Sequence, residues 1–139
     1  MAVLRDEKSG ICRPGGAFPT AGSQVSLLGG AKSDFSRSCH WFTATPSPGC
    51  AAFKPFMFDT SGNAQLTSAT RCQASGRQHH LWAAHACAQS SFARHSAQLA
   101  ALEKKYVQLA FQQRALSQSL DRDLFSEAVT EELVLYDSQ

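Results

Sequence analysis

The sequence lacks several features that identify membrane, nucleic-acid-binding or zinc-binding proteins. It has no run of about 20 apolar residues, and its first residues become charged within five positions, so we expect neither a membrane span nor a signal peptide. The net charge is only +2, with no block of Lys and Arg, which argues against a nucleic-acid partner. The five cysteines form no C-x-x-C pair, which argues against a zinc ribbon or a thioredoxin-like site. We therefore expect a cytoplasmic protein with reduced thiols.

Glycine and proline are missing from the second part of the chain. All nine glycines and all five prolines lie at or before Gly76. Because glycine supplies the positive φ of turns and proline ends helices, we expect strands and turns first and helices afterwards. The 139 residues fit one domain with a modest core. The predicted fold class is α+β, with antiparallel strands followed by a long helix.

Residues 1–58 carry the strand signals. A charged run after Val3 and Leu4 indicates the end of a helix that stops at Gly10. Alternating, β-branched and aromatic residues then predict strands over residues 22–28, 39–45 and 52–58, with a turn at 46–49. Pro55 removes a hydrogen-bond donor, so the last strand lies at an edge or begins after Pro55. Residues 59–77 are rich in polar side chains, and we interpret them as a flexible linker.

Residues 78–139 are predicted to be helical. Apolar side chains recur every three or four residues in one stripe, which is typical of an amphipathic helix with heptad character. The stripe positions are Phe92, His95, Leu99, Leu102, Tyr106, Leu109, Gln113, Leu116 and Leu120. The stripe either packs on the chain's own sheet or associates with a protein partner or a second copy.

The end of the chain predicts one more helix. It is expected to begin near Asp123 or Ser126, with Ser126 and Thr130 as candidate caps. Residues 134–136 are interpreted as a short terminal strand or a disordered tail.

The histidines invite a metal-binding interpretation. Three of them and one cysteine lie within nine residues, namely His79, His80, His85 and Cys87. Ligands on one helix should recur three or four residues apart, and these do not, so we predict no metal site. Surface histidines and contacts at the start of a helix are the favoured interpretation.

Few other residues are candidates for chemistry. No G-x-S-x-G motif is present, which argues against a serine-histidine-acid triad. The best candidates for a functional role are Arg77, Thr43, Thr45 and Lys54, which are placed to line a cleft or to fix strand ends. Such residues more often have a structural role, in which their side chains form hydrogen bonds within the protein. We therefore predict no catalytic, cofactor-binding or metal-binding residue.

Four stretches carry a family resemblance. They are LRDEKSGIC at residues 4–12, TAGSQVSLL at 20–28, CHWFTATPSPGCAAFKPFMF at 39–58 and RQHHLWAAHACA at 77–88. In this order they resemble the C-terminal part of the secernins, relatives of the cysteine dipeptidases that use an N-terminal nucleophile. The string FKPF at 53–56 is the most specific part, and beyond about residue 90 the likeness is only that both are helical.

The resemblance implies a fold and an activity. The fold is an αββα N-terminal-nucleophile hydrolase sandwich, with residues 1–58 as a strand-rich part and 78–139 as a helical C-terminal region. The activity is hydrolysis of dipeptides or short peptides through an acyl-cysteine intermediate. A processed N-terminal cysteine is suited to this because its own α-amino group, with a pKa near 8, acts as the general base. Removal of Met1 here exposes Ala2, so we expect this chain to be an inactive C-terminal portion or short isoform.

No cysteine in the sequence replaces that nucleophile. Cys12 becomes N-terminal only after the loss of eleven residues, so we expect a structural thiol there. Cys39 and Cys50 flank the predicted strand pair and can face each other, but nothing in the sequence places a base beside them.

A second role implied by the resemblance is that of a non-enzymatic interaction protein linked to regulated exocytosis. The amphipathic helix would then bind the partner. In either role, strands cut from a larger sheet leave open edges, so we expect the isolated chain to be marginally stable or to aggregate.

Overall fold

The computed structural model describes residues 1–29, 38–58, 80–89, 92–116 and 123–137. Its elements in chain order are η1 (Ala2–Arg5), β1 (Gln24–Leu27), β2 (Cys39–Phe42), η3 (Pro48–Cys50), β3 (Lys54–Phe56), α1 (His80–Ala88), α2 (Phe92–Leu116) and α3 (Leu124–Asp137), where η denotes a 3-10 helix. The predicted α+β class, with strands before helices, is confirmed. The predicted linker at 59–77, which includes Arg77, lies outside the described residues.

The strands form one antiparallel sheet in the order β1-β2-β3. Trp41 at the centre of β2 pairs with Val25 on one side and with Pro55 on the other. Pro55 therefore lies on a strand at the edge of this three-stranded sheet, which was one of the two predicted alternatives. Between β2 and β3 the chain reverses through two left-handed residues, Ala44 (φ 57°) and Ser47 (φ 55°), and then through η3. The turn predicted at 46–49 is confirmed.

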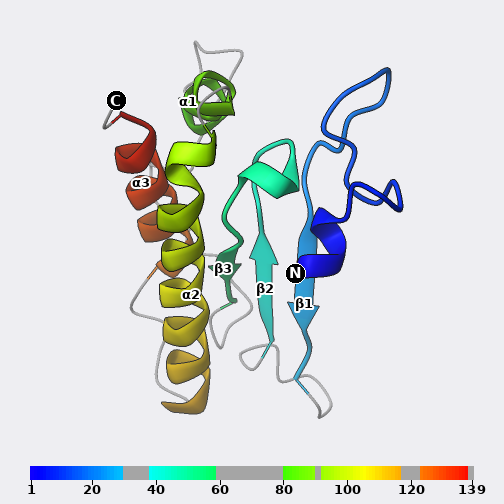
Figure 1. The fold of residues 1–139 in the computed structure, drawn as a ribbon. Helices are drawn as coiled ribbons and strands as arrows, with labels where there is room; N and C mark the ends of the chain where they lie inside the picture. The colour runs from blue at the N-terminus through cyan, green and yellow to red at the C-terminus, as the bar shows by residue number, and fades with distance from the viewer. Residues whose placement is uncertain (30–37, 59–79, 90–91, 117–122, 138–139) are drawn as a thin grey trace.

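Helices α2 and α3 lie side by side at the β3 side of the sheet, and α1 packs near one end of α3 (Figure 1). Successive residues of β2 point to opposite faces of the sheet. Cys39 and Trp41 are buried, and the Trp41 ring lies 5.8 Å from the ring of Phe111 on α2. The other face carries a half-buried set of rings in mutual contact, here called the aromatic face: His40, Phe42, Phe56, Phe58 and Phe125. Phe111 of α2 thus packs on one face of β2, and Phe125 of α3 packs on the other.

The apolar stripe of α2 is part of the core. Leu99, Leu102 and Tyr106 of the stripe are buried in one cluster with Phe53 and other residues of the sheet and of α3, and Phe92 and Leu109 are partly buried against it. The side chain of Leu116 and residue Leu120 lie outside the described parts. The described stripe therefore packs on the chain's own sheet, and little of it is left for a coiled coil. None of the described helices has the length and apolar character needed to cross a bilayer.

The N-terminal helix is shorter than predicted. It ends at Arg5 and not at Gly10, because Asp6 adopts an extended conformation (ψ 103°). The chain then turns back, with the backbone N–H of Gly10 donating to the Glu7 carbonyl at 3.1 Å and Gly10 itself at φ +78°.

The final helix also differs from the prediction. Residues 134–136 belong to α3, so the predicted terminal strand or disordered tail is wrong. The Tyr136 hydroxyl donates to Glu132 one helical turn earlier, at 2.7 Å, which requires helical spacing. The cap is Asp123, whose carboxylate accepts the Ser126 N–H at 2.9 Å, and not Ser126 or Thr130.

Shortening Leu102 to alanine tests whether the stripe is core. We expect Leu102→Ala to lower the free energy of unfolding by about 2–5 kcal/mol, because a buried leucine leaves a cavity. Ala101→Ser, at the exposed neighbouring position, should change it by less than about 0.5 kcal/mol. Urea titration followed by circular dichroism measures both. Equal, small effects would place the stripe on the surface.

Candidate functional site

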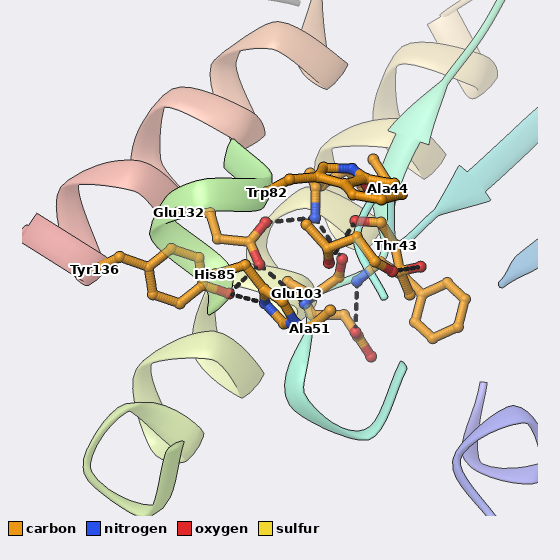
Figure 2. A network of polar contacts seen from close by, with 12 residues as sticks. Thr43, Ala44, Ala51, Trp82, His85, Glu103, Glu132 and Tyr136 are labelled. Carbon is orange, nitrogen blue, oxygen red and sulfur yellow. Dashed lines mark hydrogen bonds and ion pairs between the residues drawn. The ribbon is translucent and has the colours of Figure 1, made fainter. Parts of the chain in front are cut away.

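Two glutamates from different helices hold the chain segment that leads into β3. Glu103 of α2 accepts the backbone N–H of Phe53 at 2.9 Å. Glu132 of α3 accepts the backbone N–H of Ala52 at 3.4 Å and forms an ion pair with Lys54. These N–H groups precede β3 and need acceptors once buried. We call this arrangement the two-glutamate clasp (Figure 2).

Arg5 closes the clasp from the N-terminal side. Its guanidinium forms two hydrogen bonds with the Glu103 carboxylate, at 2.6 and 3.2 Å. It also donates to the carbonyls of Pro48 (3.0 Å) and Ala51 (2.8 Å), and it lies 4.9 Å from the centre of the Phe53 ring. A bidentate arginine–carboxylate pair is strong and directional. Arg5 therefore joins η1, the turn and α2 at one point.

The ion pair between Lys54 and Glu132 is completely buried, with both side chains 0% exposed. Lys54 also donates to the Ala52 carbonyl at 2.8 Å, and Tyr136 donates to Glu132 at 2.7 Å. Burial lowers the pKa of Lys54, and the Glu132 carboxylate opposes that shift. Burial, with the neighbouring Glu132, raises the pKa of Tyr136, so the phenol stays protonated and remains a donor.

His85 of α1 extends this network toward the turn. Its Nδ1 lies 3.2 Å from the Tyr136 hydroxyl, within hydrogen-bonding distance. Gln89 approaches the other ring nitrogen at 3.4 Å and donates to the Ser47 hydroxyl at 3.1 Å. Burial lowers the pKa of His85, which favours the neutral ring. A continuous polar chain thus runs from β3 through α3 and α1 to the turn.

The predicted candidate residues divide between this network and the turn. Lys54 is at the centre of the network. The Thr43 hydroxyl accepts the Ser23 N–H at 3.0 Å and donates to the Thr45 carbonyl at 3.1 Å, and Thr45 donates back to the Thr43 carbonyl at 3.4 Å. Both threonines are 0% exposed, so they fix the turn and the start of β1 and do not line an open cleft.

Sequence reasoning missed most of the clasp. Arg5, Glu103, Glu132 and Tyr136 were not singled out, because charged residues on an amphipathic helix normally lie in solvent. One signal was available, since Glu132 and Tyr136 are four residues apart in a helix whose other residues are largely apolar. Their burial depends on how α3 packs.

The described cysteines and histidines lie in different parts of the fold. Cys39 begins β2, whereas Cys50 lies in η3 beyond the other end of that strand. Burial raises the pKa of Cys39 to about 12 and also raises that of Cys50. His80 is exposed and His85 belongs to the buried network, while His79 lies outside the described residues. Across the described ranges no three potential His, Cys, Asp or Glu ligands are grouped for a metal ion.

The contacts of the clasp are suited to holding segments of the chain together. Its charges are paired, its donors and acceptors are largely matched, and its central residues are closed to solvent. A nucleophilic thiol needs a lowered pKa and access, and the shifts at Cys39 and Cys50 go the other way. No protein-family model matches the sequence, and no solved structure matches the fold.

The ion pair can be tested by removing its cation. Lys54→Met should lower the free energy of unfolding by about 3–5 kcal/mol, because it leaves the Glu132 carboxylate buried without its counter-ion. Adding Glu132→Gln should recover a large part of that loss, since no unpaired charge then remains. The matched control is Lys105→Met, because Lys105 and Glu131 form a half-exposed pair that should contribute at most about 1 kcal/mol. Strictly additive effects in urea titrations of the two single variants and the double variant would refute the coupling.

Acid should weaken the network through His85. Because the folded state lowers the pKa of His85 below its ordinary 6.5, the unfolded chain binds a proton more readily. Stability is therefore fully present above pH 6.5 and falls as the pH drops, by up to about 1.4 kcal/mol per pH unit for one proton. The facing charged and titratable groups are Glu132 and Tyr136 from α3 and Lys54 from β3.

We expect His85→Gln to flatten the stability profile between pH 7 and pH 5, whereas His80→Gln, at an exposed position, should leave it unchanged. Thermal unfolding at each pH measures the difference. Identical profiles for the two variants would show that His85 does not carry the acid response.

Proposed function

We propose that this chain is the C-terminal portion of a secernin-like protein of the cysteine-type dipeptidase class. In that protein it forms part of the scaffold and supplies no nucleophile. The hydrolysis of a short peptide would use a processed N-terminal cysteine from the preceding part of the longer polypeptide. The thiolate would attack the peptide carbonyl and release the amine, and water would then hydrolyse the thioester.

The observation that carries the proposal is a set of contacts among the four stretches with the family resemblance: the first, second and fourth each contact the third. Arg5 of the first stretch contacts Ala51 and Phe53 of the third. Ser23 of the second contacts Thr43 of the third at 3.0 Å. The fourth reaches the third through Trp82, whose indole N–H donates to the Ala44 carbonyl at 2.6 Å. Segments that resemble one family in order are expected to form one contiguous contact region, and these contacts are consistent with that expectation.

The aromatic face also supports the proposal. In a sandwich of two sheets, each sheet packs helices on one face and the other sheet on the second face. Phe42, Phe56 and Phe58 are half-buried and lie on the face opposite to Cys39 and Trp41. Because Phe125 of α3 contacts Phe42 and Phe56, a second sheet would pack beside α3, on the part of this face formed by His40 and Phe58.

The cysteines fit a scaffold role. Cys12 and Cys39 are each 1% exposed, and the raised pKa values of Cys39 and Cys50 favour inert thiols. The clasp then has a clear task, which is to hold the segment before β3 between the two long helices. In an enzyme, such support fixes the strands from which substrate-binding residues project.

The proposal is tested by the size and activity of the natural polypeptide. Mass spectrometry of peptides from residues 39–58 identifies it, and we expect a product well above 15.0 kDa. That product should hydrolyse dipeptides and lose this activity when its N-terminal cysteine is alkylated. The purified 139-residue chain, assayed beside it, should show no turnover. Dipeptide turnover by the short chain, or a natural product of 15.0 kDa without associated peptidase activity, would overturn the proposal.

A further inference from the structure

A groove with a volume of about 620 Å³ separates α2 from the N-terminal part of the chain. This volume lies within the range of about 300–1,000 Å³ typical of ligand sites. Its floor is formed by Phe92, Leu99, Ala100 and Val107 of α2, and its opposite wall includes Arg5 and Ala51. The groove is distinct from the buried Lys54–Glu132 pair, although both use the Arg5–Glu103 contact.

The groove is elongated. Its lining residues on α2 extend from Phe92 to Gln108, which corresponds to about 24 Å at a rise of 1.5 Å per residue. Ala100 and Gln108 are exposed, and Phe92 and Val107 are half-buried, so the groove opens to solvent along one side of α2. This shape suits a length of helix better than a compact small molecule.

The Arg5–Glu103 pair on the wall of the groove has no net charge, and its hydrogen-bonding groups already have partners within the chain. The Arg5 guanidinium uses its donors on Glu103, Pro48 and Ala51, and the Glu103 carboxylate also accepts the Phe53 N–H. Neither side chain needs a partner from outside. The wall therefore contributes shape and rigidity and little charge selectivity.

Lys104 supplies the charge that selects a partner. It lines the groove, it is exposed, and it makes no ion pair or hydrogen bond with the described residues. The next residue, Lys105, is by contrast paired with Glu131 at 2.5 Å. The groove thus combines an apolar floor with one uncompensated positive charge at its edge. Its complement is an apolar helix face with carboxylates beside it.

We propose that this groove binds an acidic amphipathic helix of another protein. Apolar residues of that helix, spaced three and four apart, pack on Phe92, Ala100 and Val107, and a neighbouring carboxylate pairs with Lys104. The inference goes beyond the scaffold role proposed above and does not depend on a peptidase activity. It is narrower than the coiled-coil alternative considered for the sequence, because only Phe92 and Leu99 of the stripe line the groove, whereas Leu102 and Tyr106 are buried in the core.

Binding can be measured by fluorescence anisotropy with a labelled synthetic helix. The probe has about 18 residues, with leucine at three- and four-residue spacing and glutamate between. A scrambled peptide of the same composition and a version with lysine in place of glutamate serve as comparisons. We expect both to bind the full chain at least about tenfold more weakly than the acidic helix. Equal binding of the acidic and scrambled peptides would overturn the proposal.

Two variants locate the site. Ala100→Trp fills the groove from an exposed position, so it should block binding without unfolding the chain. Lys104→Glu should weaken the acidic helix by about tenfold or more and make the lysine version the tighter ligand. Lys8→Glu makes the same change of charge at an exposed residue outside the groove and should have little effect.

Several results would count against the groove. Equal effects of Lys104→Glu and Lys8→Glu in the anisotropy assay would overturn the assignment. Binding of the acidic helix by Ala100→Trp with the affinity of the parent chain would overturn it as well. Sedimentation velocity tests whether a second copy of this chain occupies the groove instead. If the parent chain is a dimer that Ala100→Trp converts to a monomer, the groove is an interface between two copies and the partner-helix proposal is wrong.

Discussion

The buried ion pair between Lys54 and Glu132 constrains the rest of this fold. A lysine and a glutamate with no exposure are tolerated only when each compensates the other and the remaining donors and acceptors are satisfied. Tyr136 and the backbone of Ala52 meet that need. Since Lys54 lies on β3 and Glu132 on α3, the pair sets how this helix lies against the sheet. The register of α3 then determines which of its side chains enter the core.

The network also connects segments that are far apart in sequence. Glu103 and Glu132 come from two helices and bind adjacent backbone N–H groups before β3. Arg5 reaches across 98 residues to Glu103 and joins the N-terminal helix to the same point. Because hydrogen bonds of this kind are strongly directional, the clasp favours one arrangement of the helices over looser apolar packing. The buried polar groups therefore hold these elements together. Of the described cysteines, Cys12 and Cys39 are buried, Cys50 is half-buried and Cys87 is exposed.

Two surfaces lie beside the clasp, namely the aromatic face and the groove along α2. Phe42 and Phe56 of the aromatic face are half-buried, and both contact Phe125 of α3. The groove beside α2 has a neutral wall, an apolar floor and the single charge of Lys104. Arg5 and Glu103 of the clasp line the groove, and Lys54 lies on the same strand as Phe56 of the aromatic face. The clasp lies between them and keeps both surfaces in fixed relation to the core.

The sequence by itself determined the order and class of the elements. The last glycine, Gly76, separated strands from helices, and alternating, β-branched and aromatic residues located all three strands, because these are local effects of backbone conformation. Pro55 indicated either an edge strand or a strand that begins after it, for the same local reason. Only the tertiary structure decided that residues 134–136 are helical and that Glu103 and Glu132 are buried. Those outcomes depend on partners 50 to 80 positions away, and no local pattern specifies which charged residue of a helix will meet a buried amide or a buried lysine.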